Sequence, residues 1–155
     1  KFKEIKQNMS KFYSFTDETI KMGFIPSSIF INLSLVDAND KLKQILDLED
    51  GDKLFLLERL RLADEKIVAY DRSYIPEKII PGFKKELLNY GFRPNNSEET
   101  IEAIEINEDD ALKMRVKKNS AMLLVKRVSY YNDQKVEYNY RIVNSKLYKY
   151  KVKLS

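Results

Sequence analysis

Two consecutive runs of alternating apolar and polar residues constrain the fold of this chain most strongly. Residues 53–63 and 66–75 each alternate with a period of two, and a short polar turn separates them. A period of two places successive side chains on opposite faces of a strand. The two runs therefore predict a β-hairpin with one face in a hydrophobic core, and residues 121–131 and 135–143 predict a second hairpin.

The other segments predict helices and further strands. Helical spacing of apolar residues, together with capping residues such as Asn107, indicates the helices. The order of elements favours an α+β fold with a mainly antiparallel sheet flanked by helices, and 155 residues with 43% hydrophobic content suit a single domain. We expect helices at 14–23, 38–51, 82–90 and 107–116, and additional strands at 29–37, 98–106 and 148–154.

The chain contains neither cysteine nor histidine. Disulfides, Ser-His-Asp and Cys-His triads and most transition-metal sites are therefore excluded, and we expect no metal and no other cofactor. The acidic run at 96–110 lacks the spacing of a calcium-binding loop, so we interpret it as exposed strand and helix-cap charge. A chain without cysteine and without an apolar run of about 20 residues predicts a cytoplasmic protein outside the membrane.

The charges are mixed along the chain rather than clustered. The net charge of +4 arises from 28 basic and 24 acidic residues. A nucleic-acid-binding module usually carries a clustered basic stripe. The nearest approach is the lysine-rich C-terminal end, which includes Lys146 and Lys149, and we interpret it as the solvated edge of the last strand.

Two arginines share one face of the first hairpin. Alternation places Arg59 and Arg61 together, opposite a leucine face that belongs to the core. The register of the hairpin decides which residues lie beside them. A two-residue turn leaves Asp71 on the other face, whereas a three-residue turn sets Arg59 opposite Asp71 and brings Ser73 to the same face. The residues alone leave both registers open.

The residue types on this face suit a phosphorylated ligand. Two guanidiniums one strand step apart offer paired donors to a phosphate dianion and stay charged at neutral pH. A carboxylate would repel the phosphate, so Asp71 is better suited to accept hydrogen bonds from hydroxyls. Arginines suited to a phosphate, beside a carboxylate suited to hydroxyls, predict a pocket for a sugar phosphate. The alternative is an Arg59–Asp71 ion pair on a solvent-exposed face, which would contribute under about 1 kcal/mol.

Two other segments offer weaker candidates. The helix start at Ser14, Phe15 and Thr16 could present backbone N–H groups to an anion, or could be an ordinary helix cap. Glu137 lies in the second hairpin and, with Tyr138 and Tyr140, could line a polar cavity, or could be a surface residue.

Three stretches of the chain resemble a known family. These are SFTDETIKMGFIP, LERLRLADEKIVAYDRSYIPEKIIPGF and AMLLVKRVSYYNDQKVEYNY, in that order. From about residue 12 to the end, the chain resembles the UTRA effector-binding domain of HutC-type regulators in the GntR superfamily. The R-x-R-x-A-D hairpin followed by S-Y-I-P is the most specific part of the resemblance.

The resemblance implies a cytoplasmic, non-catalytic, homodimeric domain with a chorismate-lyase-like fold, which senses a small molecule. Operator DNA would be bound by an N-terminal winged helix-turn-helix domain that this chain lacks. We therefore expect residues 1–12 to be a linker remnant and residues 13–155 to be the UTRA domain. A chain that begins without an initiator methionine fits this expectation.

The resemblance also assigns roles at the site. In amino-sugar-phosphate sensors of the family, positions matching Arg59 and Arg61 and the turn at Phe15 and Thr16 hold phosphate, while acidic residues at the positions of Asp71 and Glu137 hold hydroxyls. The stretch GFKKELL places Lys85 where those sensors have hydroxyl side chains, and Val143 replaces a ligand-binding tyrosine. The predicted ligand-binding residues are Phe15, Thr16, Arg59, Arg61, Asp71, Ser73, Lys85 and Glu137.

The resulting expectation is an effector-sensing domain that binds a sugar phosphate or amino-sugar phosphate and thereby modulates DNA binding by its parent protein. Two alternatives stay open. One is an enzyme related to chorismate lyase, whose chemistry needs neither histidine nor cysteine. The other is a dimerisation module without a ligand.

Overall fold

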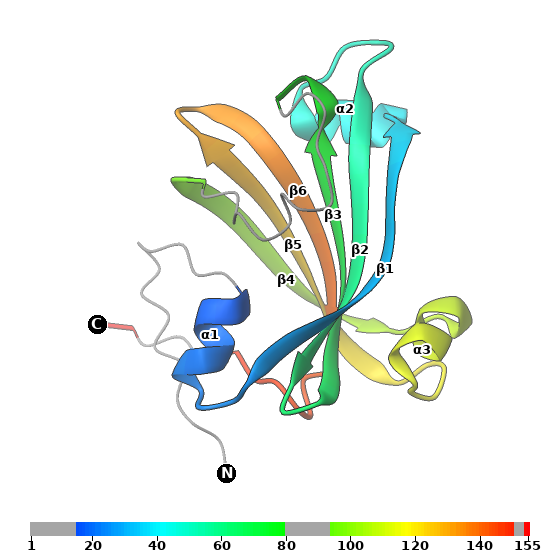
Figure 1. Cartoon of the computed structure of the whole chain (residues 1–155), viewed down its shortest axis with the longest axis vertical. Helices are drawn as coiled ribbons and strands as arrows, with labels where there is room; N and C mark the ends of the chain where they lie inside the picture. The colour runs from blue at the N-terminus through cyan, green and yellow to red at the C-terminus, as the bar shows by residue number, and fades with distance from the viewer. Residues whose placement is uncertain (1–14, 80–93, 151–153) are drawn as a thin grey trace.

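The computed structural model describes residues 15–79, 94–150 and 154–155, and these form one antiparallel sheet with three helices (Figure 1). The sheet has six strands in the order β1-β2-β3-β6-β5-β4. This arrangement confirms the predicted α+β fold. The strands are β1 (Pro26–Asp37), β2 (Lys53–Ala63), β3 (Lys66–Pro76), β4 (Asn96–Glu105), β5 (Ala121–Tyr131) and β6 (Gln134–Val143). The helices are α1 (Phe15–Lys21), α2 (Asp40–Leu46) and α3 (Glu108–Met114), and η1 (Glu77–Ile79) is a 3-10 turn.

Both predicted hairpins are present, and they join at the centre of the sheet. Strand β3 of the first hairpin pairs with β6 of the second, which sets Asp71 opposite Arg141 and Ser73 opposite Asn139. Residues directly opposite each other in an antiparallel pair lie on the same face. The polar residues of the two hairpins therefore meet in the middle of one face of the sheet.

The β2–β3 hairpin combines features of the two predicted registers. Its turn contains only Asp64 and Glu65, which have φ angles of 47° and 66°. The register nevertheless shifts beyond Arg61, which pairs with Ala69, and Val68 has no partner in β2. This bulge adds the residue that a longer turn would have supplied. Arg59 consequently pairs with Asp71 despite the two-residue turn.

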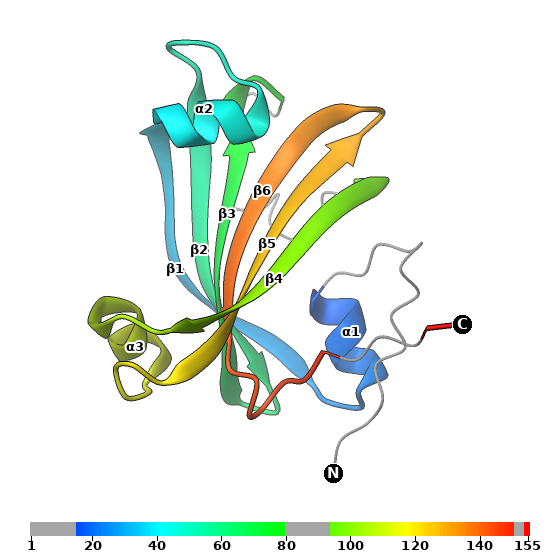
Figure 2. The same ribbon diagram turned by 180° about the vertical axis from the view of Figure 1, so that it is seen from behind.

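The helices divide between the two faces of the sheet (Figures 1 and 2). Helices α2 and α3 cover one face, where Leu46 packs against Leu54 and Met114 packs in a cluster with Tyr70. Helix α1 and the chain after β6 cover the other face. The buried residues there include Phe15, Met22, Ala69, Val125, Val143 and Tyr148. This second face also carries the arginines of β2.

Some predicted elements differ in the structure. The chain after β6 forms turns in which Leu147 and Tyr148 donate backbone hydrogen bonds to the Asn144 carbonyl, so the strand expected from residue 148 is wrong for its described part. Strand β1 begins earlier than expected, at Pro26. The predicted helix at 82–90 lies outside the described residues. In the described part of the chain, no helix has the length and apolarity needed to cross a membrane.

Candidate functional site

The structure brings Arg59, Arg61 and Asp71 together on the α1 face of the sheet. The Asp71 Oδ2 atom lies 3.0 Å from Arg61 Nε and 3.5 Å from Arg59 Nη2. Only 1% of the Asp71 side chain is exposed, against 18% for Arg59 and 13% for Arg61. The ion pair therefore exists, but it is enclosed and does not lie on a solvent-exposed face.

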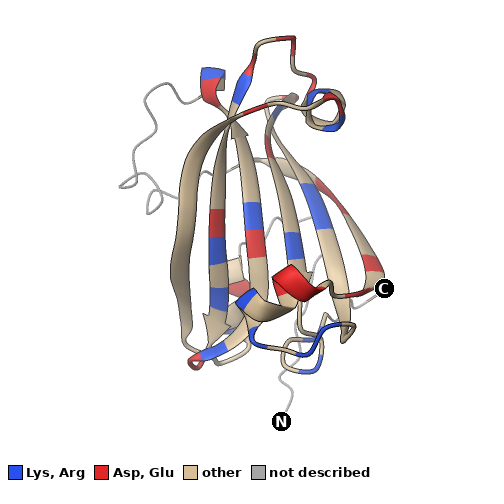
Figure 3. Ribbon diagram, turned by 90° about the vertical axis from the view of Figure 1, so that its right-hand side faces the viewer, with Lys and Arg blue, Asp and Glu red and all other residues tan. Residues whose placement is uncertain are grey.

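A third guanidinium, which the sequence analysis missed, completes the cluster. Arg141 on β6 places its Nε atom 3.5 Å from Asp71 Oδ1. Asn139, on the same face of β6, donates hydrogen bonds to Asp71 Oδ1 and, at 2.9 Å, to Ser73 Oγ. Figure 3 shows that basic and acidic residues occur on neighbouring strands of the sheet, as blue and red bands. We call Arg59, Arg61, Arg141 and Asp71 the arginine cluster.

Asp71 has a different environment from the one expected for a residue that contacts sugar hydroxyls. Both of its carboxylate oxygens already face internal partners, and the side chain is buried. A hydroxyl of a ligand would have to displace one of these partners. The geometry instead makes Asp71 the residue that holds the three guanidiniums in place.

Helix α1 begins against the arginine cluster. The ring of Phe15 lies 5.3 Å from the guanidinium carbon of Arg61 and 5.4 Å from that of Arg141, which is within the range of cation–π interactions. Thr16 follows in the first turn and is exposed. On the side of β1, Arg61 Nη1 donates a 3.0 Å hydrogen bond to Ser28 Oγ. Phe15 of α1 thus contacts both guanidiniums, and Ser28 of β1 contacts that of Arg61.

Several buried polar atoms of this face lack a hydrogen-bond partner among the described residues. They are Arg59 Nε, Arg141 Nε and Ser129 Oγ. Buried donors are normally paired, so an unpaired set on one face indicates where a ligand acceptor would be accommodated. Asp71 is the single carboxylate within ion-pair distance of the three guanidiniums in the described chain. Glu18 of α1 adds a more distant favourable charge to Arg141.

Burial and charge shift the pKa values of the cluster in opposite directions. Burial alone would raise the pKa of Asp71, but the attraction of Arg141, Arg61 and Arg59 outweighs it and holds the pKa well below its ordinary value. Burial lowers the pKa of Arg61 to about 10, and the positive charges of Arg59 and Arg141 act in the same direction. Arg61 and Asp71 are therefore both charged at neutral pH.

Glu137 lies on the same face as the arginine cluster, paired across the strands with Ser129. Burial raises the pKa of Glu137, and the negative charge of Asp71 adds to this effect, while a hydrogen bond with Ser73 opposes it. Tyr138 and Tyr140 point to the opposite face, where they pack near α2. The expected polar cavity lined by Glu137 with these tyrosines is therefore wrong.

Alternation along β6 could have identified Asn139 and Arg141, which were not among the residues predicted from the sequence. Glu137, Asn139 and Arg141 occupy every second position, so a strand must place them on one face. Ser129 follows from the same argument once β5 is paired with β6. Lys85 lies outside the described residues. No group of three carboxylates that could hold a metal ion occurs among the residues that the structure describes.

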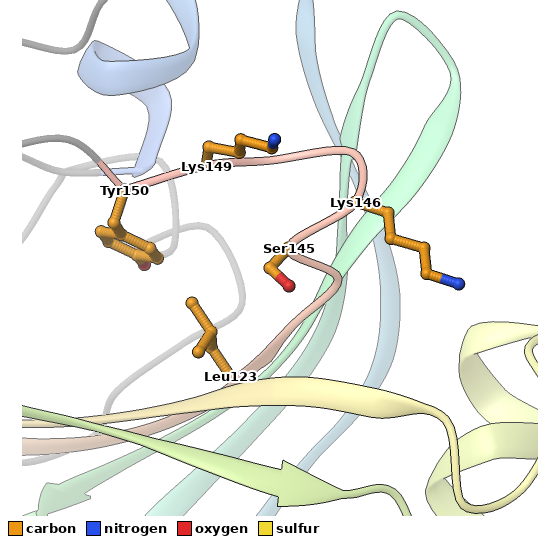
Figure 4. A pocket seen from close by; sticks show the side chains of 5 residues that line it. All are labelled: Leu123, Ser145, Lys146, Lys149 and Tyr150. Atoms are coloured by element: carbon orange, nitrogen blue, oxygen red, sulfur yellow. The ribbon is translucent and has the colours of Figure 1, made fainter.

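A cavity of about 560 Å³ adjoins this face near the C-terminal turns. Its wall is formed by Leu123, Ser145, Lys146, Lys149 and Tyr150 (Figure 4). Tyr150 contacts Tyr148 edge-on at 5.9 Å, and Tyr148 stacks on Phe15 at 5.5 Å. A chain of aromatic rings thus runs from the arginine cluster to the cavity.

Comparison with solved structures places the fold among effector domains of bacterial regulators. The effector domain of PhnF from Mycobacterium smegmatis is similar, with a TM-score of 0.84, 20% identity and coverage of 97% of this chain and 98% of that chain. A GntR-family transcriptional regulator from Enterococcus faecalis V583 matches with a TM-score of 0.77, 22% identity and coverage of 83% and 100%. At these identities the likeness concerns the fold.

The family follows from the sequence itself. The sequence model of the UTRA domain matches residues 21–149, and this chain belongs to that family. The resemblance noted in the sequence is thereby confirmed.

Curated relatives are longer proteins. The transcriptional repressor NagR of Bacillus subtilis (strain 168) is 23% identical over 137 residues, which is 82% of this chain and 56% of the repressor. The transcriptional regulator GgaR of Escherichia coli (strain K12) is 30% identical over 66 residues, or 43% of this chain and 27% of that protein. The chain spans about half or less of the length of these relatives.

Proposed function

We propose that this chain is the effector-binding domain of a GntR-family transcriptional regulator and that its effector is a small anionic metabolite, most specifically a sugar phosphate or amino-sugar phosphate. The observation that carries the proposal is the arginine cluster, in which three guanidiniums face one buried carboxylate. Arg59 has a buried Nε–H without an acceptor among the described residues, and Arg141 Nε makes no hydrogen bond there beyond its 3.5 Å ion pair with Asp71. The names of the similar proteins support the regulatory role.

A phosphate would supply the acceptors that this face lacks. Its oxygens accept several charge-assisted hydrogen bonds at once, and guanidiniums suit that geometry. We assign phosphate contact to Arg59 and Arg61, with Phe15 and Thr16 at the start of α1. Ser73, Glu137 and Ser129, farther along the same face, would contact hydroxyls of the ligand. Lys85 belongs to the proposed site on sequence grounds alone.

The proposed mechanism is regulatory and involves no bond chemistry. The effector would favour one arrangement of a homodimeric parent protein over another and thereby change its affinity for operator DNA, which a separate winged helix-turn-helix domain would bind. A ligand can shift such an equilibrium only by binding the two arrangements with different affinities. We place the protein in the cytoplasm, where phosphorylated metabolites occur.

A thermal-shift experiment tests the proposal. The chain is heated with glucosamine 6-phosphate, other sugar phosphates, inorganic phosphate and the matching unphosphorylated sugars. A ligand at 100 times its dissociation constant adds about 2.7 kcal/mol of stability, which raises the midpoint by several degrees. We expect a shift with a phosphorylated compound and none with its unphosphorylated counterpart.

Two variants make the assignment specific. Arg59→Ala should weaken phosphate-dependent binding at least tenfold, because a charge-assisted hydrogen bond contributes about 1.5–3 kcal/mol. Lys126→Ala is the control, since Lys126 is a basic residue on the other face of the sheet, paired with exposed Glu102. An equal response of wild type and Arg59→Ala, or no response to any phosphorylated compound, would contradict the proposal.

A further inference from the structure

The arginine cluster contains more hydrogen-bond donors than its neighbours in the described chain use. Each guanidinium carries five N–H donors. Among the described residues, only Arg61 donates hydrogen bonds from its guanidinium, one to Asp71 and one to Ser28. Arg59 and Arg141 approach Asp71 to 3.5 Å, and their buried Nε atoms form no hydrogen bond with a described residue. Two of the three guanidiniums therefore have donors to offer to a ligand.

Asp71 divides these donors into two sets. Across the sheet, Arg59 of β2 pairs with Asp71 of β3, which pairs in turn with Arg141 of β6. The Oδ2 atom of the carboxylate faces the two arginines of β2, whereas the Oδ1 atom faces Arg141 and Asn139. Adjacent strands lie about 4.8 Å apart, so the backbones of Arg59 and Arg141 are separated by about 10 Å. One donor set thus belongs to β2 and the other to β6.

A single anion is poorly suited to both donor sets. A phosphate centred between them would lie against the carboxylate of Asp71, and like charges at short range repel each other. The ring of Phe15 takes up further space beside both sets, 5.3 Å from the guanidinium carbon of Arg61 and 5.4 Å from that of Arg141. Two anionic groups, one on each side of Asp71, would use both sets with less repulsion.

We propose that the effector carries two separate anionic groups, a phosphate bound by Arg59 and Arg61 and a second anion bound by Arg141. This inference rests on the proposed function and narrows its ligand class. The second group is a carboxylate or another phosphate, as in a phosphorylated sugar acid or a sugar bisphosphate, because a guanidinium binds either with paired donors. Arg141 is then the residue that selects among sugar phosphates.

Isothermal titration calorimetry in phosphate-free buffer tests this proposal with two matched pairs of ligands. Fructose 1,6-bisphosphate is compared with fructose 6-phosphate, and 6-phosphogluconate with glucose 6-phosphate, so that one member of each pair adds a phosphate or a carboxylate. In at least one pair, we expect the doubly anionic member to bind about tenfold more tightly or better, the effect of one charge-assisted hydrogen bond. The pair that shows the preference identifies the second group.

Three variants assign the preference to Arg141. Arg141→Gln should reduce the preference to less than about threefold, because it removes the charge and the paired donors. Arg59→Ala should weaken binding of both members of a pair, since both carry the phosphate that we assign to Arg59. Lys126→Ala, on the other face of the sheet, should keep the wild-type preference.

Equal binding of both members in both pairs would overturn this proposal and leave the sugar-phosphate function in place. Absence of binding by every phosphorylated compound would overturn both. A wild-type preference retained in Arg141→Gln would also overturn the assignment. If circular dichroism shows that Arg141→Gln does not fold, Arg141→Lys takes its place. That variant keeps a positive charge but loses the paired donors, so its preference should be smaller than that of wild type.

Discussion

A buried aspartate beside three guanidiniums determines the electrostatics of the candidate site at the residue scale. Asp71 keeps Arg59, Arg61 and Arg141 within 3.5 Å of its oxygens while almost none of its surface reaches solvent. Without that carboxylate, three like charges would be left close together in a partly desolvated space. Asp71 therefore stabilises both the fold and the arrangement of donors that we propose for phosphate.

Replacement of Asp71 by asparagine should show this through its pH dependence. The pKa of Asp71 is lowered in the folded state, so its contribution to stability is present above the unfolded pKa of about 3.9 and is lost as the pH falls towards the folded pKa. At about pH 7, Asp71→Asn should lose about 3 kcal/mol or more, because buried charges lose their partner. Urea unfolding at about pH 7 and about pH 3 measures the difference.

The loss of stability in Asp71→Asn should be smaller at about pH 3 than at about pH 7. An equal loss of stability at both pH values would contradict the account, because it would mean that the ionised carboxylate contributes nothing beyond the packing of the side chain.

Glu137 should behave in the opposite way. Burial raises its pKa in the folded state, so the stability of the protonated form is complete below the unfolded pKa of about 4.3 and is lost as the pH rises through the folded pKa. Glu137→Gln removes this dependence. The variant should therefore match wild type at about pH 4 and have a higher melting temperature at about pH 8, as measured by circular dichroism.

A matched control for Glu137→Gln is available on β4. Glu102 forms a surface ion pair with Lys126, so Glu102→Gln should change stability by less than about 1 kcal/mol at either pH. A lower melting temperature of Glu137→Gln at the alkaline end would show that the ionised carboxylate is stabilised in the folded chain, contrary to our expectation.

At the element scale, the two hairpins use the same turn. Asp64 and Glu65 have φ angles of 47° and 66°, and Asn132 and Asp133 have the same two values. Positive φ at both central residues defines the turn type that matches the twist of a hairpin. Asparagine and aspartate tolerate this conformation, whereas glutamate in the second position is strained.

Replacing the strained residue by glycine should stabilise the chain. Glu65→Gly should raise the free energy of unfolding by about 0.5–1 kcal/mol, because glycine adopts φ of +66° without a steric cost. Asp133→Gly, at the equivalent position of the other hairpin, should give a smaller gain. Urea unfolding of both variants measures the two changes, and a loss of stability in Glu65→Gly would contradict the argument.

Local signals in the sequence predicted most elements of the fold. Alternation identified β2, β3, β5 and β6, helical spacing of apolar residues identified α2, and the capping residue Asn107 marked α3. The strand expected from residue 148 failed because alternation of tyrosine and lysine does not show whether the tyrosines pack in a sheet. Tyr148 instead packs on Phe15, and its chain turns back at Asn144.

Long-range pairing limited what could be predicted of the site. Arg59 and Arg61 were found because they lie in one strand, and their distance from Asp71 depended on a bulge at Val68 that no local signal announced. Arg141 was missed because it reaches Asp71 only when β3 pairs with β6, and these strands are far apart in the sequence. The faces of a strand are local information, whereas the neighbours of a strand are not.

At the scale of the whole molecule, the sheet separates two layers. Helix α1 and the chain after β6 cover the face that carries the arginine cluster, and α2 and α3 cover the other face. Ser28 of the edge strand β1 contacts Arg61, so the candidate site extends to that edge of the sheet.

Strand β3 contributes residues to two charged networks, one on each face of the sheet. Asp71 faces the arginine cluster, while its neighbours Tyr70 and Arg72 face α3, where Arg72 lies 3.0 Å from Asp110 and the Tyr70 hydroxyl accepts a hydrogen bond from Lys113 at 3.1 Å. Adjacent residues share a backbone, so a displacement that moves Asp71 also moves the contacts of α3. Helix α3 is thus a remote reporter of the site, and amide hydrogen exchange in its first turn should register occupancy on the opposite side of the sheet.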